Sequence, residues 1–232
     1  MNDCRRLAVF DIDGTLVDSQ HNIVAGMTAA CQVLGVQPPP AEAVRRIIGL
    51  SLADAMARLF PDGDERLYQA IVQGFRQAFS DNKMRPDHRE PMFPGAAAAL
   101  RRLDAGGWLL GIATGKSRRG VDMMIERFGL EGLFVTLQTP DANPGKPHPG
   151  MVLSALAETG VPPARAVMIG DTVYDMAMGM RAGVRTAGVA WGYHPPEELL
   201  AAGADIMLGH YGELPAALDA LLGRTTCAQV PS

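Results

Sequence analysis

Short apolar segments alternate with longer amphipathic segments along most of the chain. Six apolar segments predict β-strands, at residues 7–10, 108–113, 133–137, 166–169, 186–191 and 205–208. Segments with helical periodicity lie between the later ones, at residues 95–104, 117–128, 149–159, 174–182 and 196–201. This alternation predicts an α/β fold, a Rossmann-like parallel sheet with helices on both faces.

The part of the chain after the first strand departs from this alternation. It contains no strand pattern, but four helical patterns follow one another at residues 21–34, 41–48, 52–60 and 65–79, separated by turns rich in Pro and Gly. We therefore expect an all-helical domain at residues 18–89, inserted into an α/β core that comprises residues 1–17 and 90–232. Residues 224–232 resemble a frayed tail.

Composition and charge exclude several classes of partner. A formal net charge of −4 over 232 residues favours neither nucleic acid nor an anionic membrane surface. No apolar run approaches the ~20 residues that span a bilayer. The N-terminus lacks a secretory apolar segment, and the three cysteines are too scattered for a disulfide framework or a zinc cluster. We expect a cytoplasmic monomer or homodimer with free thiols at Cys4, Cys31 and Cys227.

The segment FDIDGTLVDS at residues 10–19 carries the first chemical signal. Asp13 and Gly14 suit a turn, but a turn uses only one of the acids. Asp11 and Asp13 stand two residues apart at the end of a strand, where their charges repel unless a cation or a proton lies between them. Ligands bind at strand ends in open α/β sheets, so we predict a metal-assisted active site. Asp18 and Ser19 are expected only to begin the first inserted helix.

Complementary groups follow the other strands. Thr114, Gly115 and Lys116 come directly after the second strand, and this pattern suits an anion. Asp171 follows the fourth strand in the sequence Gly-Asp-Thr, with Asp175 one helical turn later. Lys146 lies between them in a loop held by two prolines. Each of these motifs, taken alone, is more often a helix cap, a turn or an exposed residue. Their shared position at strand ends favours a functional site.

The motifs DxDGTLVDS, TGK, the Lys-Pro loop and GDTxxD together resemble the haloacid-dehalogenase superfamily of phosphohydrolases. The resemblance covers almost the whole chain, and the helical insertion is similar to the first type of cap domain in that family. The segments FDIDGTLVDS, IIGLSLADAM and VMIGDTVYDMAMGMRAGV are most similar to the phosphoglycolate-phosphatase-like branch. The resemblance implies a phosphatase for a small phosphorylated metabolite, with 2-phosphoglycolate the first compound to test.

The residues suit this chemistry. Asp11 is expected to be the nucleophile that forms an aspartyl-phosphate, and Asp13 the acid for the leaving group and then the base for water. The hydroxyl of Thr114, the N–H of Gly115 and the ammonium of Lys146 are expected to hold the phosphoryl oxygens. Lys146 would also neutralise Asp11 in the resting site.

Magnesium is the expected cofactor, because Mg²⁺ prefers oxygen ligands and keeps several waters. The expected ligands are a side-chain oxygen of Asp11, the backbone carbonyl of Asp13 and the carboxylate of Asp171. Asp175 is expected to be a nearby or water-mediated partner.

Substrate contacts are expected from the inserted domain and from the rim of the core. The loop with Gly49, Leu50 and Ser51 is predicted to face the site and to read the leaving group. Lys116 begins a helix. Two arrangements of its side chain are compatible with the sequence: exposure to solvent, or contact with a carboxylate of the substrate. Residues 191–194 are expected to line the crevice between the core and the inserted domain. A separate expectation is that five methionines pack in the core: Met123, Met124, Met176, Met178 and Met180.

Three other functions are compatible with parts of this pattern. A dehalogenase has no need of an acid for its halide leaving group, so Asp13 argues against that activity. A β-phosphoglucomutase-like mutase needs cationic side chains that bind a distal phosphate. At the two positions where the mutases that this chain resembles carry them, this sequence has Ile48 and Leu52. Arg45 and Arg46 are expected to be a solvated pair. A catalytically silent phosphate-sensing protein is the third alternative, and the complete set of motifs argues against it.

Overall fold

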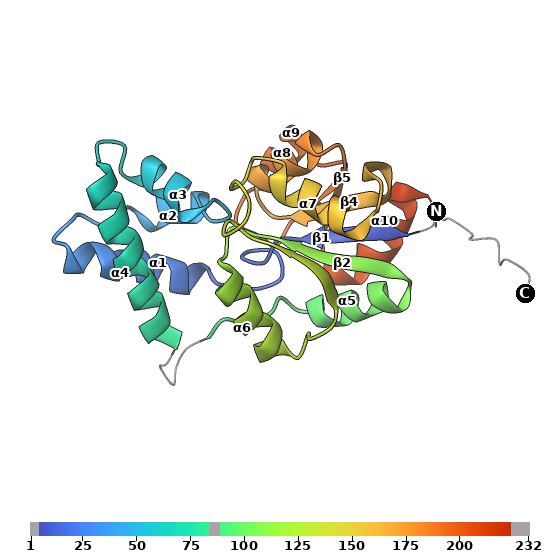
Figure 1. The fold of residues 1–232 in the computed structure, drawn as a ribbon, viewed down its shortest axis with the longest axis horizontal. Helices are drawn as coiled ribbons and strands as arrows, with labels where there is room; N and C mark the ends of the chain where they lie inside the picture. Colours follow the sequence, from blue (N-terminus) through green and yellow to red (C-terminus); the bar gives the residue numbers. More distant parts are fainter. Residues whose placement is uncertain (1–4, 84–88, 224–232) are drawn as a thin grey trace, which may run out of the picture.

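The computed structural model describes residues 5–83 and 89–223. Its centre is a sheet of six parallel strands in the order β3-β2-β1-β4-β5-β6 (Figure 1). The strands are β1 (Arg6–Phe10), β2 (Trp108–Ala113), β3 (Phe134–Gln138), β4 (Ala166–Gly170), β5 (Arg185–Val189) and β6 (Ile206–Leu208). The predicted parallel sheet is confirmed, and each of the six strands overlaps a predicted segment.

Both faces of the sheet are covered, as the unbroken apolar runs of its strands require. On one face, Ala8 and Phe10 pack in a cluster with α5 (Ala96–Ala105), α6 (Arg118–Phe128) and α10 (Leu214–Leu222). On the other face, Leu7 and Val9 pack with α7 (Gly150–Thr159) and α8 (Val173–Arg181). Helix α9 (Pro196–Ala201) lies beside α8 (Figure 1). No described helix is long and apolar enough to cross a membrane.

Helix α10, which completes the first of these faces, was not predicted from the sequence. Leu214 and Leu218, one turn apart, are both fully buried. The helix begins without a side-chain cap, although Pro215 in its first turn is itself a helix-start signal. The frayed tail that was expected at residues 224–232 lies outside the described residues.

Four helices follow β1 and form what we call the helical unit: α1 (Gln20–Val33), α2 (Ala41–Arg46), α3 (Leu52–Leu59) and α4 (Glu65–Lys83). They gather to one side of the sheet (Figure 1) around their own buried cluster, which includes Met27, Met56 and Ile71. Cys31 lies in this cluster as a buried free thiol, whereas Cys4 and Cys227 lie outside the described residues. The predicted domain division at residues 18 and 89 stays a prediction.

Two chain segments run side by side between the sheet and the helical unit. Val17 forms an antiparallel bridge with Met92. On either side of it, Asp18 N–H donates to the Pro91 carbonyl and Phe93 N–H donates to the Leu16 carbonyl, both at 2.9 Å. These bonds fix the segment that leads from the end of β1 to the start of α1.

The methionines are only partly in the core. Met124, Met176 and Met178 are buried as expected. The expectation was wrong for Met123 and Met180, which are 41% and 54% exposed. Met123 lies one position, or about 100° around the helix, from the buried Met124, and Met180 lies in the last turn of α8.

Candidate active site

The predicted catalytic residues lie where the chain order of the sheet reverses. Strand β1 pairs with β2 on one side and β4 on the other, so the carboxyl ends of the three strands are adjacent. Asp11, Thr114 and Asp171 follow these ends directly, and all three are fully buried. This is the position at which ligands bind in doubly wound sheets.

Asp11, Asp171 and Asp175 form what we call the three-acid cluster. Each offers a carboxylate oxygen, and these oxygens all lie within 4.8 Å of one another. The buried ammonium of Lys146 lies 2.8 Å from Asp11 Oδ1 and 2.6 Å from Asp175 Oδ1. Lys146 contacts two of the three carboxylates and supplies one positive charge, so the cluster has an excess of negative charge when all three acids are ionised.

The pKa values of the cluster reflect this burial and repulsion. Burial raises the pKa of Asp11 to about 6, against the opposing effect of the Lys146 charge. Burial, together with the charges of Asp175 and Asp11, also raises the pKa of Asp171. For Lys146 burial works toward a lower pKa, but the two carboxylates it contacts outweigh it and its pKa is raised. Lys146 is therefore an ammonium at neutral pH.

Asp175 caps helix α8 and also contacts Lys146. Its Oδ2 accepts hydrogen bonds from the N–H of Thr172 at 3.0 Å and from the Thr172 hydroxyl at 2.7 Å. The Thr172 side chain in turn accepts from the Asp175 N–H at 3.3 Å, which completes a capping box at the start of α8. The cap orients Asp175 so that Oδ1 faces Lys146.

Asp171 is held from two other segments. The Thr15 hydroxyl donates to Oδ1 at 2.8 Å, and the Tyr193 N–H donates to Oδ2 at 2.9 Å. Gly14 lies against the same carboxylate with φ of +90°, and a Cβ atom there would be 2.1 Å from Asp171 Oδ2. Only glycine suits this turn, because it needs both the left-handed backbone and the missing side chain.

Lys146 lies in the loop between β3 and α7. Asn143 anchors this loop: its side-chain amide donates to Gln138 Oε1 at 3.0 Å, and its Oδ1 accepts from the Ser154 hydroxyl at 2.8 Å. The His148 N–H donates to the Gly145 carbonyl at 3.0 Å, and the peptide bond between Lys146 and Pro147 is cis. The loop is therefore tied to the strand before it and the helix after it.

The three-acid cluster has the donors of a hard-cation site. Asp11 Oδ2 is buried and has no hydrogen-bond or ion-pair partner among the residues that the structure describes. A divalent cation would satisfy this oxygen and offset the excess negative charge. Carboxylate oxygens are also the ligands that Mg²⁺ prefers. The residues present thus fit the metal predicted from the sequence.

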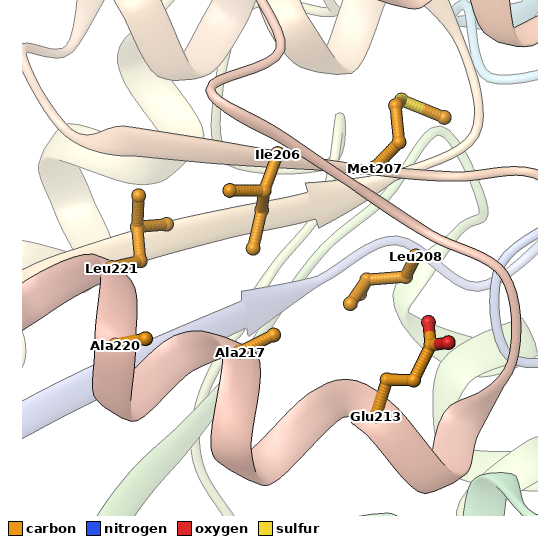
Figure 2. A pocket seen from close by; sticks show the side chains of 7 residues that line it. All are labelled: Ile206, Met207, Leu208, Glu213, Ala217, Ala220 and Leu221. Atoms are coloured by element: carbon orange, nitrogen blue, oxygen red, sulfur yellow. The ribbon is translucent and has the colours of Figure 1, made fainter.

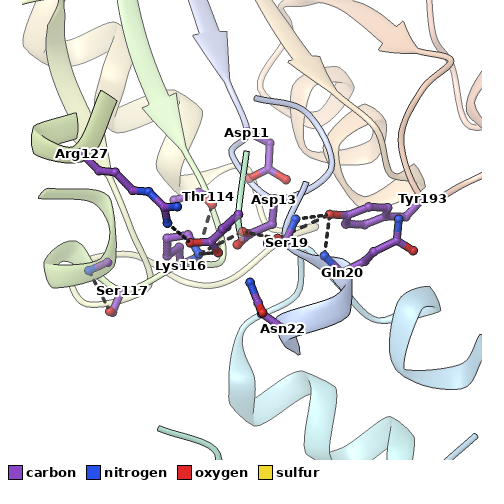
Figure 3. Close-up of polar contacts among 12 residues, drawn as sticks. Asp11, Asp13, Ser19, Gln20, Asn22, Thr114, Lys116, Ser117, Arg127 and Tyr193 are labelled. Carbon is purple, nitrogen blue, oxygen red and sulfur yellow. Dashed lines mark hydrogen bonds and ion pairs between the residues drawn. The ribbon is translucent and has the colours of Figure 1, made fainter. Parts of the chain in front are cut away.

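Asp13 is not one of the three acids of this cluster, and Figure 3 shows its side chain between Ser19 and Lys116. Its Oδ1 accepts a hydrogen bond from the Ser19 hydroxyl at 2.7 Å and lies 2.9 Å from the ammonium of Lys116. Its carboxylate is therefore not among the grouped metal ligands, and a contribution through its backbone carbonyl stays a prediction. The side chain is instead available for proton transfer.

Lys116 is not solvated, since its side chain is only 10% exposed. Its N–H donates to the Thr114 hydroxyl at 3.3 Å, and α6 begins only after the cap residue Ser117. Burial lowers the pKa of Lys116, but the charges of Asp13 and Glu90 outweigh burial and the pKa is raised. The turn thus places a charged ammonium beside Asp13.

Two neighbours of Lys116 were not predicted from the sequence. Glu90 Oε1 lies 4.0 Å from the Lys116 ammonium, and the Arg127 guanidinium lies 3.6 Å from the other oxygen of Glu90. The ring of Phe79 in α4 lies 5.4 Å from the same ammonium. Neither Glu90 nor Phe79 belongs to a motif, so no local signal marks them.

The loop at residues 49–51 lies against Gly115, one of the predicted site residues. A Cβ atom at Gly115 would be 2.6 Å from the Leu50 carbonyl, so the two turns touch through backbone. Ser51 uses its hydroxyl to cap α3, where it accepts from the Asp54 N–H at 3.3 Å. A role for Gly49, Leu50 and Ser51 in substrate binding stays a prediction.

Residues 191–194 lie between the turn after β1 and the helical unit. Trp191 Nε1 donates to the Thr15 carbonyl at 3.1 Å, and His194 Nε2 lies 3.2 Å from the Arg46 carbonyl. The side chains of Arg45 and Arg46 are 35% and 40% exposed, so both are partly solvated as expected, but each also has a partner. Arg46 pairs with Glu198 of α9 at 2.7 Å, and Arg45 donates to Gln20 Oε1 at 3.0 Å, because α2 packs against other elements.

A separate hollow of ≈ 640 Å³ lies between β6 and α10 (Figure 2). It is lined mostly by aliphatic side chains, with Glu213 at one side. None of the residues that line it belongs to the predicted site, so this hollow is not the candidate active site.

Curated proteins similar to this chain are phosphatases of several kinds. A probable phosphatase, IndB, from Dickeya dadantii is 34% identical, over 93% of this chain and 94% of its own. The pyrophosphatase PpaX from Bacillus pumilus is 33% identical, over 91% and 95%. A phosphoglycolate phosphatase from Psychrobacter arcticus is 28% identical, over 84% and 87%.

A solved structure and a family model also match most of the chain. A solved hydrolase from Pseudomonas syringae superposes with a TM-score of 0.82 at 26% identity, over 93% of this chain and 98% of its own. The family model described as haloacid dehalogenase-like hydrolase matches residues 8–189. The resemblance drawn from the sequence motifs is thereby confirmed, and the chain belongs to the haloacid dehalogenase-like hydrolase family.

Proposed function

We propose that this hydrolase is a phosphatase that cleaves a small phosphate monoester through an aspartyl-phosphate at Asp11. One observation carries this proposal. The Asp11 carboxylate is fully buried, it is held by Lys146 through Oδ1, and its Oδ2 has no partner among the described residues. A carboxylate with one oxygen anchored and the other open has the arrangement that a nucleophile needs.

In the first step, an oxygen of Asp11 forms a bond to phosphorus and the ester P–O bond breaks. The leaving alkoxide takes a proton from Asp13, whose side chain lies outside the three-acid cluster. In the second step, water gives its proton to Asp13 and attacks phosphorus. Inorganic phosphate leaves, and the Asp11 carboxylate and protonated Asp13 are restored.

The core supplies the groups that hold the phosphoryl oxygens. Lys146 is a buried ammonium beside the nucleophile, so bulk solvent screens its charge only weakly. The Thr114 hydroxyl and the Gly115 N–H lie on the turn at the end of the adjacent strand β2. Such fixed donors stabilise charge that develops on the transferring group.

We assign Mg²⁺ to Asp11, Asp171 and the backbone carbonyl of Asp13, with Asp175 as a nearby partner that Lys146 and Thr172 already engage. When bound, such an ion neutralises the phosphoryl charge and lets an anionic substrate approach the carboxylates. Lys146 alone leaves an excess of negative charge in the cluster.

For the substrate, 2-phosphoglycolate is our first candidate. Lys116 offers a charged, mostly buried ammonium beside Asp13, which matches a carboxylate on the leaving group. The phosphoglycolate phosphatase among the similar proteins supports this choice, whereas the pyrophosphatase points to a different leaving group. We further propose that residues 18–89 act as a cap that reads this group.

A panel of three phosphate monoesters and one phosphoanhydride tests the assignment. Phosphate release should be measured with Mg²⁺ on 2-phosphoglycolate, ethyl phosphate, pyrophosphate and p-nitrophenyl phosphate. A preference for 2-phosphoglycolate over ethyl phosphate is expected. Preference for pyrophosphate would reject the substrate assignment, and no release from any compound would reject the phosphatase.

A mutase is the second candidate function. Ile48 is 4% exposed and aliphatic, so it cannot hold a distal phosphate at one of the positions where the mutases carry a cation. Incubation with β-glucose 1-phosphate and a trace of the bisphosphate should therefore yield glucose or no product. Accumulation of glucose 6-phosphate would favour the mutase.

A further inference from the structure

Ser19 stands at the start of α1 but does not cap it. A serine at this position normally accepts a hydrogen bond from an N–H in the first turn of the helix. Here the residue has φ −110° and ψ −3°, and its side chain makes no capping bond. Its hydroxyl donates instead to Asp13 Oδ1 at 2.7 Å, and Ser19 is fully buried.

The missing cap is supplied by a different part of the chain. The hydroxyl of Tyr193, in the loop between β5 and α9, accepts hydrogen bonds from the N–H groups of Ser19 at 3.0 Å and Gln20 at 3.1 Å (Figure 3). These are among the groups that a helix start leaves unpaired. The Tyr193 N–H also donates to Asp171 Oδ2, so the loop is fixed to the three-acid cluster.

The hydroxyl protons decide which residue is the donor where the hydroxyls of Ser19 and Tyr193 meet. Ser19 has one hydroxyl proton, and its 2.7 Å bond to the Asp13 carboxylate uses it. At the 3.4 Å contact between the Tyr193 and Ser19 hydroxyls, Tyr193 is therefore the donor. Burial raises the pKa of Tyr193, so the phenol keeps the proton that it donates.

The contacts of Asp13 leave one oxygen free. Ser19 and Lys116 both bind Oδ1. Among the described residues, Oδ2 has no hydrogen-bond or ion-pair partner. Oδ2 is therefore the oxygen that is available to a leaving group.

We propose that Tyr193 is a positioning residue for Asp13: it caps α1 in place of Ser19, and so frees the Ser19 hydroxyl to orient the Asp13 carboxyl group. This inference rests on the proposed role of Asp13 as the acid for the leaving group. Without the Tyr193 hydroxyl, the two N–H groups at the helix start lose their acceptor. The Ser19 hydroxyl is then free to accept from an N–H further along the first helical turn, as an ordinary N-cap serine does, and releases Asp13.

The test compares substrates whose leaving groups differ in their need for a proton. An alkyl phosphate needs the acid, whereas p-nitrophenolate leaves readily without it. Tyr193→Phe and Ser19→Ala should each lower kcat/KM for ethyl phosphate about tenfold more than kcat/KM for p-nitrophenyl phosphate. The double variant should show no larger selective loss than either single variant, because both act through the same bond.

Tyr211→Phe is the matched control. It also removes a buried tyrosine hydroxyl next to the turn after β1, where Tyr211 donates to the Thr15 carbonyl at 2.6 Å. That carbonyl keeps its second donor, Trp191 Nε1. The ratio of the two kcat/KM values should stay at the wild-type value in this variant, even if its melting temperature falls.

Asp13→Asn separates the role of Asp13 from the role of Tyr193. If Asp13→Asn damages both substrates equally, the acid role of Asp13 is wrong and the positioning role falls with it. If Asp13→Asn is selective for ethyl phosphate but Tyr193→Phe and Ser19→Ala lower both rates equally, Asp13 keeps its role and the positioning by Tyr193 is overturned.

Discussion

The ammonium of Lys146 lies 2.8 Å from Asp11 Oδ1, and neither side chain is exposed to solvent. This pair joins two predicted site residues that lie far apart in the sequence, one after β1 and one in the loop before α7. The same ammonium contacts Asp175 at 2.6 Å. Lys146 thus balances the charge of the nucleophile and of its neighbour at once.

Lys146→Met should destabilise the fold as well as stop turnover. It leaves Asp11 and Asp175 buried without their cation, and the loss of one partner from a buried pair costs about 3–5 kcal/mol. Urea unfolding in the absence of divalent cations measures this loss. The control is Arg185→Met, which breaks a more exposed pair with Asp205 and should cost less than about 1 kcal/mol. Equal losses in the two variants would contradict the account.

Metal removal should silence the enzyme and also lower its stability. Chelation leaves the carboxylates of the three-acid cluster to repel one another, and Mg²⁺ should restore activity. Calcium should bind and inhibit, because its larger and looser coordination misplaces the nucleophile. At a hundred times its dissociation constant, an ion that binds only the folded state stabilises it by about 2.7 kcal/mol. Scanning calorimetry should show this rise in wild type and a smaller one in Asp171→Asn.

Gly14→Ala should disrupt the site through Asp171. The added Cβ atom would lie 2.1 Å from Asp171 Oδ2 and would also strain a backbone with φ of +90°. Gly35→Ala is a matched control, since Gly35 has φ of +66° but a Cβ atom there would meet no atom within 4 Å. Gly35→Ala should cost about 1 kcal/mol of unfolding free energy from strain alone. Gly14→Ala should cost more and abolish turnover, and equal effects on stability would remove the argument from Asp171.

Lys116→Met should discriminate between substrates. If the ammonium binds a carboxylate on the leaving group, the variant should raise KM for 2-phosphoglycolate about tenfold or more. KM for ethyl phosphate, which has no carboxylate, should change less than about threefold. Parallel changes for both compounds would show that Lys116 does not read the substrate.

The fold could be predicted largely because its signals are local. The apolar strands and the intervening helical periodicity are each legible over a few residues, and Asp11, Thr114 and Asp171 mark strand ends. Helix α10 was missed although Pro215 in its first turn is a local start signal, so this miss is not due to a lack of signal in the sequence. The contacts of Lys116 could not be foreseen, since a lysine before a helix looks the same whether its chain is solvated or turned inward.

The contact between Ser19 and Tyr193 shows a second limit. The two residues are 174 positions apart, and their bond depends on where the loop after β5 meets the start of α1. Ser19 carries the local signature of a helix cap, so the sequence alone predicts that task for it. In the structure, the Tyr193 hydroxyl accepts the capping hydrogen bonds, and the Ser19 hydroxyl donates to Asp13.

The most direct test of the central claim is to trap the phosphorylated enzyme. The protein should be mixed with substrate and Mg²⁺, quenched in acid within the first turnover, digested and mapped by mass spectrometry. The account predicts one added phosphoryl group on Asp11, and its absence in Asp11→Asn, whose turnover should fall below a thousandth of wild type, a barrier change of about 4 kcal/mol. A phosphoryl group on another residue, or turnover in Asp11→Asn above that limit, would contradict the assignment of Asp11 as the nucleophile.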